Sequence, residues 1–281
     1  MINGTTKLYG IIGNPVGHSL SPSMHNAAFA ALGENRVYLP FPVQDVQAAL
    51  AGLKALGIEG VSVTIPHKET VIPYLDRIDP VALAIGAVNT IEVRREGEET
   101  ALCGSNTDWL GANRALGGEM ELPGARVVVL GAGGSSRAIG FGLKEAGADI
   151  ILCSRTASKG KALASDLACP WFPLAEIAKL QGDALINATS VGMSPRPDAS
   201  PAPFEMLRSF RVVMDIVYAP LQTRLLREAE QAGCRTVSGL EMLLYQGAAQ
   251  FELWTGLAAP VEVMRAALLG AGSGKTGEKG G

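Results

Sequence analysis

The stretch VVVLGAGGSSRA, residues 127–138, runs from an apolar segment through a glycine-rich turn into a segment of small residues. The four apolar residues Val127–Leu130 predict a short strand buried on both faces, as in a parallel sheet covered by helices. Gly131 and Gly133 suit a tight turn, and a helix beginning at Gly134 would offer free N–H groups and a positive end to phosphates. This order is typical of a dinucleotide-binding βαβ unit. The third position of the usual G-x-G-x-x-G pattern is Ser136, so a turn that only packs strand on helix is the alternative.

The end of the next expected strand, Ile150–Cys153, indicates which dinucleotide would bind. NAD-binding units carry an acidic residue there, which accepts hydrogen bonds from the ribose, whereas this chain has Ser154-Arg155-Thr156 with Lys159 just beyond. An arginine cannot accept those bonds but pairs well with a 2′-phosphate, so the sequence favours NADP. It also disfavours a methyltransferase, which would use the same carboxylate. The alternative is an ordinary solvent-exposed arginine.

The alternation of strands and helices predicts an α/β protein with two domains. Further strands are expected at 184–186, 212–214 and 236–237, which continue the doubly wound pattern that begins with the strand at 127–130. Before it, strands at 8–12, 61–65, 87–93 and 100–105, with helices from Ser21 and from about Gln44, predict a smaller α/β domain. Two helices are expected at 239–256 and 260–269, followed by a disordered, Gly- and Lys-rich tail over 271–281.

Composition excludes several classes of function. The 281 residues are 47% hydrophobic and 18% charged with a net charge of −3, which fits a compact cytoplasmic protein and not a nucleic-acid or anionic-lipid binder. No apolar run reaches the roughly 18 residues of a membrane helix. The four cysteines form no C-x-x-C pair, so neither zinc nor a disulfide framework is expected. The string GAGSGKT, residues 270–276, resembles a P-loop, but Leu269 stands where that motif needs glycine and no strand precedes it.

Candidate substrate-binding residues concentrate in the first domain. Ser19 and Ser21 lie just before an expected helix N-terminus and could hold a carboxylate, although Ser21 could equally be a simple helix N-cap. Lys68 follows a strand and a proline turn, which puts it at the sheet edge where α/β proteins bind ligands. The three histidines show no metal-ligand spacing, so ordinary hydrogen-bonded histidines are expected.

Several strings, in one order over about residues 5–270, resemble the shikimate dehydrogenase family. They are 13–26 (GNPVGHSLSPSMHN), 63–68 (VTIPHK), 86–90 (GAVNT), 106–111 (NTDWLG), 131–138, 154–156, 187–193 (NATSVGM), 215–220 (DIVYAP) and 245–254 (YQGAAQFELW). The resemblance implies a substrate domain of residues 1–108 and 239–270, and a Rossmann NADP domain of 109–238. It also implies NADPH-dependent reduction of 3-dehydroshikimate to shikimate, a step of aromatic amino-acid biosynthesis.

The resemblance also implies roles for individual residues. Lys68 would be the catalytic proton-transfer group, with Asp108 beside it. The substrate would be held by Ser19, Ser21, Thr64, Asn89, Asp108, Tyr218 and Gln246. NADP would be bound by Gly131, Ala132, Gly133, Gly134, Ser135, Ser154, Arg155, Thr156, Lys159, Thr189, Ser190, Met193, Ile216 and Gly239. No metal is implied, and the protein would be a monomer or a homodimer.

Three residues depart from what is common in the family, namely Pro80, Ser135 and Ser154. Two alternative functions stay open. A non-catalytic NADP-binding relative would have lost the acid–base pair, which this chain retains as Lys68 and Asp108. Oxidation of quinate or aminoshikimate would use the same fold.

Overall fold

The computed structural model describes residues 2–97 and 99–273, which form two compact α/β units. The first comprises the chain up to Thr107 together with the segment from Gln246 onward, and the second is Asp108–Tyr245. Helix α9, Gly239–Thr255, begins in the second unit and ends in the first. The described chain contains no helix that is both long and apolar enough to cross a membrane.

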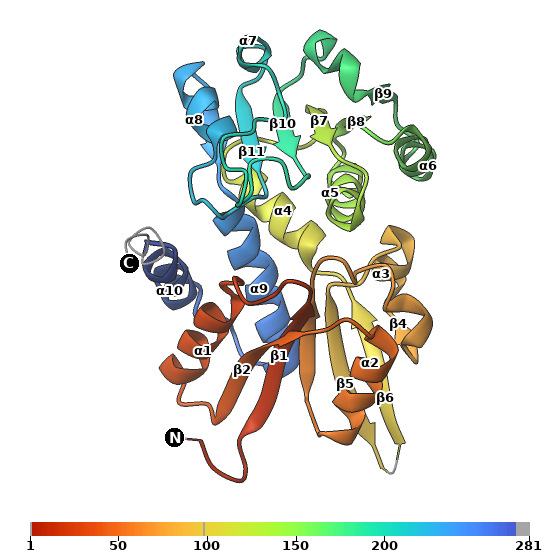
Figure 1. The fold of residues 1–281 in the computed structure, drawn as a ribbon, viewed down its shortest axis with the longest axis vertical. Helices are drawn as coiled ribbons and strands as arrows, with labels where there is room; N and C mark the ends of the chain where they lie inside the picture. The colour runs from red at the N-terminus through yellow and green to blue at the C-terminus, as the bar shows by residue number, and fades with distance from the viewer. Residues whose placement is uncertain (1, 98, 274–281) are drawn as a thin grey trace. The chain divides into compact units, whose positions relative to one another are not determined.

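The first unit is built on a mixed six-stranded sheet in the order β2-β1-β3-β5-β6-β4 (Figure 1). Its strands are β1 (Lys7–Gly13), β2 (Arg36–Pro42), β3 (Gly60–Val63), β4 (Arg77–Ile78), β5 (Thr90–Glu96) and β6 (Glu99–Ser105). Its helices are α1 (Ser21–Ala31), α2 (Val46–Ala55), η1 (Ile72–Tyr74), α3 (Pro80–Ile85), the end of α9, and α10 (Val261–Ser273). Strand β2 was not among the strands expected from sequence, because Pro40 and Pro42 argue against a strand anywhere except at a sheet edge, where β2 lies.

Alternate residues of these strands face two separate cores. Helix α2 packs Leu50 and Leu53 on one face, against residues such as Val61 and Ile91. The other face carries the aromatic cluster, which we define as Tyr9, His25, Phe29, Tyr38, Phe251 and Trp254. The period of two in a strand sends neighbouring residues to opposite faces, so the sheet is covered by helices on both sides.

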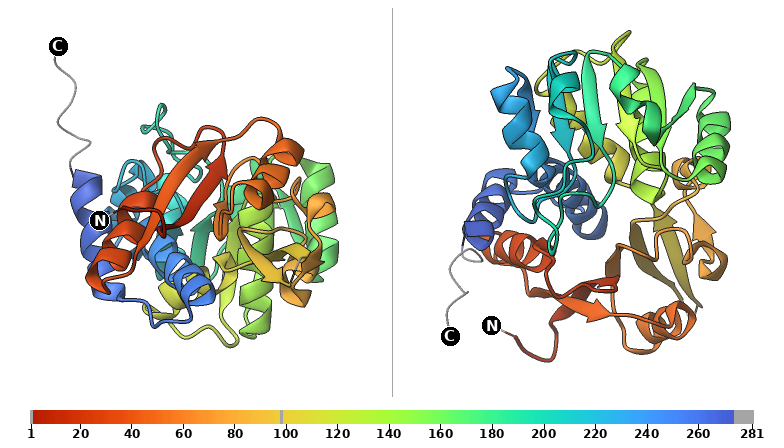
Figure 2. Two further views of the ribbon diagram at one scale, coloured as in Figure 1. Left: turned by 90° about the horizontal axis from the view of Figure 1, so that it is seen from below. Right: turned by 45° about the horizontal axis from the view of Figure 1, so that its top comes forward.

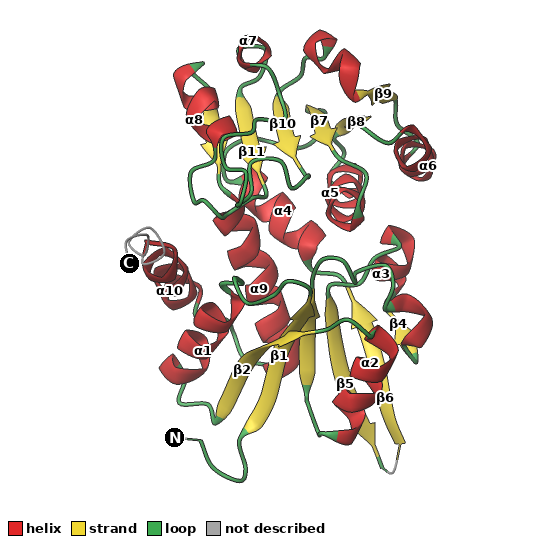
Figure 3. Cartoon of the chain, viewed as in Figure 1, coloured by secondary structure: helices red, strands yellow, loops and turns green. Residues whose placement is uncertain are grey.

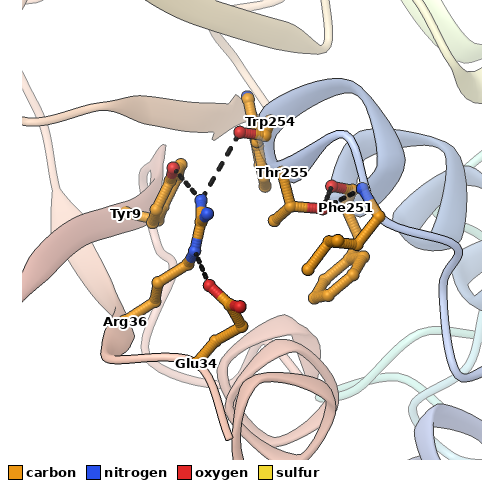
Figure 4. Close-up of polar contacts among 7 residues, drawn as sticks. Tyr9, Glu34, Arg36, Phe251, Trp254 and Thr255 are labelled. Carbon is orange, nitrogen blue, oxygen red and sulfur yellow. Dashed lines mark hydrogen bonds and ion pairs between the residues drawn. The ribbon is translucent and has the colours of Figure 1, made fainter. Parts of the chain in front are cut away.

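The end of α9 is fixed to the sheet by hydrogen bonds as well as by packing. Trp254 donates its indole N–H to the Ile91 carbonyl over 3.2 Å, and a Cβ at Gly60 would lie 2.5 Å from that indole nitrogen. The Arg36 guanidinium donates to the Tyr9 hydroxyl over 2.7 Å and to the Trp254 carbonyl over 3.5 Å (Figure 4). The expected return of the C-terminal helices to the first domain is therefore confirmed. Helix α10 continues to Ser273, three residues into the expected disordered tail, and residues 274–281 lie outside the described residues.

The second unit contains a parallel six-stranded sheet in the order β12-β11-β10-β7-β8-β9. Its strands are β7 (Arg126–Leu130), β8 (Asp149–Ser154), β9 (Trp171–Pro173), β10 (Ala184–Asn187), β11 (Val212–Asp215) and β12 (Arg235–Val237). Its helices are α4 (Asp108–Gly117), α5 (Gly134–Glu145), α6 (Ala157–Leu167), η2 (Leu174–Lys179), α7 (Phe204–Leu207), α8 (Arg224–Gln231) and the start of α9.

The central strands of the second unit, β7, β10 and β11, are buried on both faces, as the apolar run 127–130 predicted. Val127 and Val129 pack against helices α4, α5 and α6, whereas Val128 and Leu130 pack against η2, α7 and α8. Figure 2 and Figure 3 show these helices on both sides of the strands. This is the expected doubly wound arrangement.

His25 of the aromatic cluster is a buried histidine that makes no hydrogen bond. Its ring stacks on Tyr38, with centroids 4.5 Å apart, and is 0% exposed. Neither ring nitrogen has a hydrogen-bond partner among the described residues, so the expectation of an ordinary hydrogen-bonded histidine is wrong here. Burial lowers the pKa of His25 to about 3, which the nearby Gln250 side chain opposes only in part.

This burial predicts a specific loss of stability in acid. The unfolded chain takes up a proton on His25 near its ordinary pKa of 6.5, but the folded chain does so only near 3, so its contribution to stability is lost as pH falls through that window. We expect His25→Phe, which keeps a ring on Tyr38, to gain about 2 kcal/mol relative to the wild type between pH 6.5 and 4.5. Urea unfolding at several pH values measures this, with the exposed His18→Phe as control. If the free energies of unfolding of the wild type and of His25→Phe changed with pH in parallel, this prediction would be contradicted.

Candidate active site

The sheet of the first unit brings several chain segments to one edge. Strands β1 and β3 are parallel, so the loops after Gly13 and Val63 leave on the same side. Strand β5 is antiparallel to β3 and β6 is antiparallel to β5, so the start of β5 and the end of β6 lie at that edge too. Residues distant in sequence therefore meet there, which is where α/β folds place ligands.

The loop after β1 holds the two serines. The Ser19 hydroxyl accepts a hydrogen bond from the Ser21 N–H over 3.2 Å. Ser21 is not the N-cap of α1, because Leu20 occupies that position and Ser21 is the first helical residue, followed by Pro22. Ser21 is 3% exposed. Its hydroxyl does not serve as the N-cap of α1.

The turn after β3 holds Thr64 and Lys68. The Thr64 N–H donates to the Ile12 carbonyl, and a Cβ at Gly13 would lie 2.4 Å from the Thr64 methyl carbon, so only glycine fits there. The buried His67 ring lies 2.8 Å from the Val43 carbonyl, and the Lys68 carbonyl accepts from the Val88 N–H. These bonds fix the backbone on both sides of the Lys68 side chain and bring it next to the segment that carries Asn89.

Asn89 immediately precedes β5 and is 2% exposed. Its side-chain oxygen accepts from the Thr107 N–H over 2.8 Å and from the Thr90 hydroxyl over 2.7 Å. Its amide nitrogen donates to the Thr107 hydroxyl over 3.0 Å and to the Gln246 side-chain oxygen over 3.2 Å. The structure thus joins two residues that the resemblance implied, Asn89 and Gln246, across a sequence separation of 157.

The glycine-rich turn of the second unit leaves room at the start of α5. Gly131 has φ +123°, and a Cβ there would lie 2.6 Å from the Ser136 hydroxyl and 2.9 Å from the Ala188 carbonyl. A Cβ at Gly133, the N-cap of α5, would meet nothing within 4 Å. Gly134 and Ser135 are the first residues of the helix and Ala132 lies in the turn. The turn therefore has the open space and the helix N-terminus that a pyrophosphate needs.

The segment after β8 presents cationic side chains to solvent. Arg155 and Lys159 are exposed, and neither forms an ion pair within the described chain. The Ser154 hydroxyl is engaged internally, since it accepts from the Trp171 indole over 2.9 Å and donates to the Thr156 carbonyl over 3.3 Å. Ser154 thereby holds the loop in place, while Thr156 is the N-cap of α6. The two exposed cations fit an anionic group such as a 2′-phosphate.

Asn187 and Asp215 tie together the loops that follow β10 and β11. Asn187 donates to the Asp215 carboxylate over 2.9 Å, and its oxygen accepts from the Thr189 hydroxyl over 2.6 Å. Asp215 also accepts from the Val217 N–H over 3.0 Å and from the Thr223 hydroxyl over 2.7 Å. These bonds fix the two loops that carry the remaining predicted residues, which are Thr189, Ser190, Met193, Ile216 and Tyr218.

Two predicted residues open helices of the second unit. Asp108 is the first residue of α4 and is buried. Gly239 is the first residue of α9, and a Cβ there would lie 2.4 Å from the Ile216 carbonyl. Glycine at 239 therefore lets α9 begin directly against the loop that carries Ile216.

Sequence reasoning assigned no role to Asn187 or Asp215. A polar residue at the end of a buried strand was the available signal, since Asp215 directly follows the apolar run 212–214. Asp215 is 0% exposed, and burial raises its pKa to about 6 against the lowering effect of its three hydrogen bonds. In the described chain, no three His, Cys, Asp or Glu side chains are grouped so as to bind a metal ion.

Asp215 predicts a pH dependence of opposite sign to that of His25. Its pKa is raised from 3.8 to about 6, so the folded chain keeps a proton that the unfolded chain has lost, and this contribution to stability is full below pH 4 and declines as pH rises to 6. We expect the free energy of unfolding of the wild type, measured relative to that of Asp215→Asn, to fall by about 2 kcal/mol between pH 4 and pH 7. Urea unfolding measures it, and the exposed Asp149→Asn is the control. A difference that stays constant with pH would refute the assignment.

Comparisons with known proteins identify the family of the chain. Residues 11–91 match the shikimate dehydrogenase substrate binding domain, and residues 239–269 match the shikimate 5'-dehydrogenase C-terminal domain. The NADP-dependent shikimate dehydrogenase of Moorella thermoacetica is 48% identical over 97% of both chains, and that of Pyrococcus furiosus is 49% identical over 94% of this chain and 96% of its own. The Thermus thermophilus enzyme, whose crystal structure is a complex with NADP(H) and shikimate, has 38% sequence identity to this chain. The two structures superimpose with a TM-score of 0.86, and the match covers 95% of this chain and 100% of that one. The chain belongs to the shikimate dehydrogenase family.

Proposed function

We propose that this protein is an NADP-dependent shikimate dehydrogenase that reversibly reduces 3-dehydroshikimate to shikimate. The observation that carries the proposal is the gathering of Ser19, Ser21, Thr64, Lys68, Asn89 and Gln246 at one edge of the first unit's sheet. We assign substrate binding to this unit and NADP binding to the second. The enzyme would act in the cytoplasm, in aromatic amino-acid biosynthesis, as a monomer or a homodimer.

The first unit offers the groups that such a substrate needs. Hydroxyl and N–H donors beside a helix N-terminus can bind a carboxylate, and Ser19 and Ser21 supply two hydroxyls at the start of α1. Ring hydroxyls both donate and accept hydrogen bonds, which matches the side chains of Thr64, Asn89 and Gln246. Tyr218 is assigned to the same substrate from the second unit. Several fixed contacts far from the reacting carbon orient it for a single reaction.

Lys68 is the group that moves the proton. Reduction of a ketone builds alkoxide charge on its oxygen, and an ammonium within hydrogen-bond reach lowers that barrier by donating a proton. The backbone on either side of Lys68 is fixed by the Val88 and Thr64 bonds, so its side chain starts from a defined point. The family motif assigns Asp108 to the same step.

The second unit fits the cofactor that the family uses. NADPH, when bound, supplies the hydride. The N-terminus of α5 and the space beside Gly133 would hold its pyrophosphate, with Gly131, Ala132, Gly134 and Ser135 around it. Arg155, Thr156 and Lys159 would hold its 2′-phosphate, on the loop that Ser154 braces. The residues Thr189, Ser190, Met193, Ile216 and Gly239 would line its nicotinamide half.

Lys68→Ala tests the proton-transfer role. We expect kcat with shikimate and NADP to fall by roughly 10²- to 10⁴-fold, the usual range for a positioned acid or base, with little change in KM. Lys54→Ala is the matched control, since Lys54 lies in the same unit and pairs with Asp76 at the surface. A Lys68→Ala enzyme that retained half of the wild-type kcat would contradict the proton-transfer role of Lys68. The same assays with quinate and with NAD test the alternative substrates and cofactor.

Arg155→Ala tests the choice of cofactor. A charge-assisted hydrogen bond contributes about 1.5–3 kcal/mol, so we expect kcat/KM for NADP to fall by roughly ten- to 150-fold while that for NAD is unchanged. The preference for NADP should also weaken as salt is added, because an exposed phosphate contact is screened. Since Lys159 can compensate in part for the lost charge, the Arg155/Lys159 double variant should lose more.

The matched control for Arg155 is Arg211→Ala. Arg211 is exposed and directly precedes β11, at the opposite end of the strand from Asp215, and its replacement should leave both cofactors unaffected. If Arg155→Ala weakened NADP and NAD equally, Arg155 would be supporting the loop and not selecting the phosphate.

A further inference from the structure

Gln250 is a buried glutamine one helical turn beyond Gln246 on α9. Its side chain is 1% exposed and makes three hydrogen bonds. The amide nitrogen donates to the Asn89 carbonyl over 3.0 Å and to the Thr90 hydroxyl over 2.8 Å. The amide oxygen accepts from the Ser62 hydroxyl over 2.7 Å. None of the proposed catalytic or binding roles uses this residue.

The partners of Gln250 define which way its amide points. The Asn89 carbonyl can only accept a hydrogen bond, so the group facing it is the amide nitrogen and the oxygen must face Ser62. Ser62 then donates to Gln250 and accepts from the Tyr38 hydroxyl over 2.6 Å. The order of donation therefore runs from Tyr38 through Ser62 to Gln250.

The same order continues to the substrate-binding residues. Gln250 donates to the Thr90 hydroxyl, which can then donate to the Asn89 side-chain oxygen over 2.7 Å. The Thr107 N–H, which can only donate, points at that same oxygen and imposes the same orientation on the Asn89 amide. The amide nitrogen of Asn89 is then left to donate to the Gln246 oxygen. We call the series Tyr38, Ser62, Gln250, Thr90, Asn89 and Gln246 the hydrogen-bond relay.

Two glutamines on successive turns of α9 thus hold one asparagine at two points. Gln246 accepts from the Asn89 side chain, and Gln250 donates to the Asn89 main chain and, through Thr90, supports its side-chain oxygen. This fixes the position of α9 along β5. It also fixes the Gln246 amide with its oxygen toward Asn89 and its nitrogen directed away from that residue.

We propose that Gln250 is a positioning residue for substrate binding, which acts through the relay by setting the location and amide orientation of Asn89 and Gln246. The inference rests on the proposed function for the identity of the ligand. A reversed Gln246 amide would put two N–H groups face to face at Asn89, which leaves a buried donor without a partner. The relay prevents that reversal, and Gln250 is the member that links the aromatic cluster to Asn89.

Gln250→Met keeps the length of the side chain and removes all three hydrogen bonds. We expect KM for shikimate to rise by roughly three- to tenfold, the effect of one net hydrogen bond, with kcat and KM for NADP within about twofold of the wild type. Phe251→Leu is the control, because Phe251 is the next residue of α9, is fully buried and is not part of the relay. It should lower stability without changing KM for shikimate. An equal rise of KM in both variants would show that Gln250 is merely structural.

A double-mutant cycle tests whether Gln250 acts through Gln246. We expect Gln250→Met to raise KM for shikimate in the wild type but to have almost no further effect in a Gln246→Met background. Effects that multiply would overturn the proposal. Thr90→Val, which has the same shape and breaks the relay between Gln250 and Asn89, should reproduce the KM effect and keeps the proposal testable if Gln250→Met does not fold.

Solvent exchange of the Asn89 side-chain amide protons, followed by NMR, tests the relay without any substrate. We expect exchange at least about tenfold faster in Gln250→Met than in the wild type, because a hydrogen bond of about 1.4 kcal/mol changes the opening equilibrium tenfold. Unchanged exchange would overturn the relay even if shikimate is turned over. If the wild type does not turn over shikimate at all, the proposed function fails, and the exchange rates still decide the relay.

Discussion

The first unit depends on Asn89, a buried carboxamide whose hydrogen bonds tie several segments of the chain together. Its main chain joins β3 and β6, since its carbonyl accepts from the Val63 N–H and its own N–H donates to the Ser105 carbonyl. Its side chain joins the segment after β6 to helix α9. A buried polar group left without partners costs about 1–3 kcal/mol, so these elements are held in one arrangement by a single side chain. The proposed substrate site is built around that arrangement.

In the second unit, a buried asparagine is paired with a carboxylate. Asn187 donates to Asp215, whereas in the first unit Asn89 donates to the amide oxygen of Gln246. Asn187 and Asp215 end neighbouring parallel strands and are paired in register. Both are fully buried, and each fixes the loop that follows its own strand. The carboxylate accepts three hydrogen bonds, but burial still raises the pKa of Asp215 to about 6. The consequence is a stability that depends on pH, which the all-amide arrangement around Asn89 avoids.

Local sequence patterns predicted the parts of the fold that depend on interactions between residues close together in the sequence. The apolar run 127–130, the turn at Gly131 and the helix from Gly134 were all predictable, because each rests on residues next to one another. Strand β2 was missed since its prolines oppose a strand unless it lies at an edge, and edge position is a property of the whole sheet. Ser21 was a reasonable N-cap from sequence, yet α1 begins at Ser21 itself, with Leu20 at the cap.

Local patterns pointed to some candidate site residues, such as Ser19, Lys68 and Arg155, whereas the rest of the candidate set came from family motifs. The groups that hold these residues were not predictable. Gln250 and Asn89 are 161 residues apart, so no spacing rule links them. His25 and Gln250 would both be read as ordinary polar residues of amphipathic helices. Their burial follows from the return of α9 to the first unit, which brings Trp254 against Gly60 and carries Gln246 and Gln250 to Asn89.

Carboxamides suit this place better than carboxylates because they can orient a neighbouring side chain without burying a charge. An amide carries no net charge, so its burial adds no titrating group, unlike the burial of Asp215 in the second unit. It also has distinct donor and acceptor ends, which a carboxylate lacks. Direction without charge is the property by which the proposed relay would fix the orientation of Gln246.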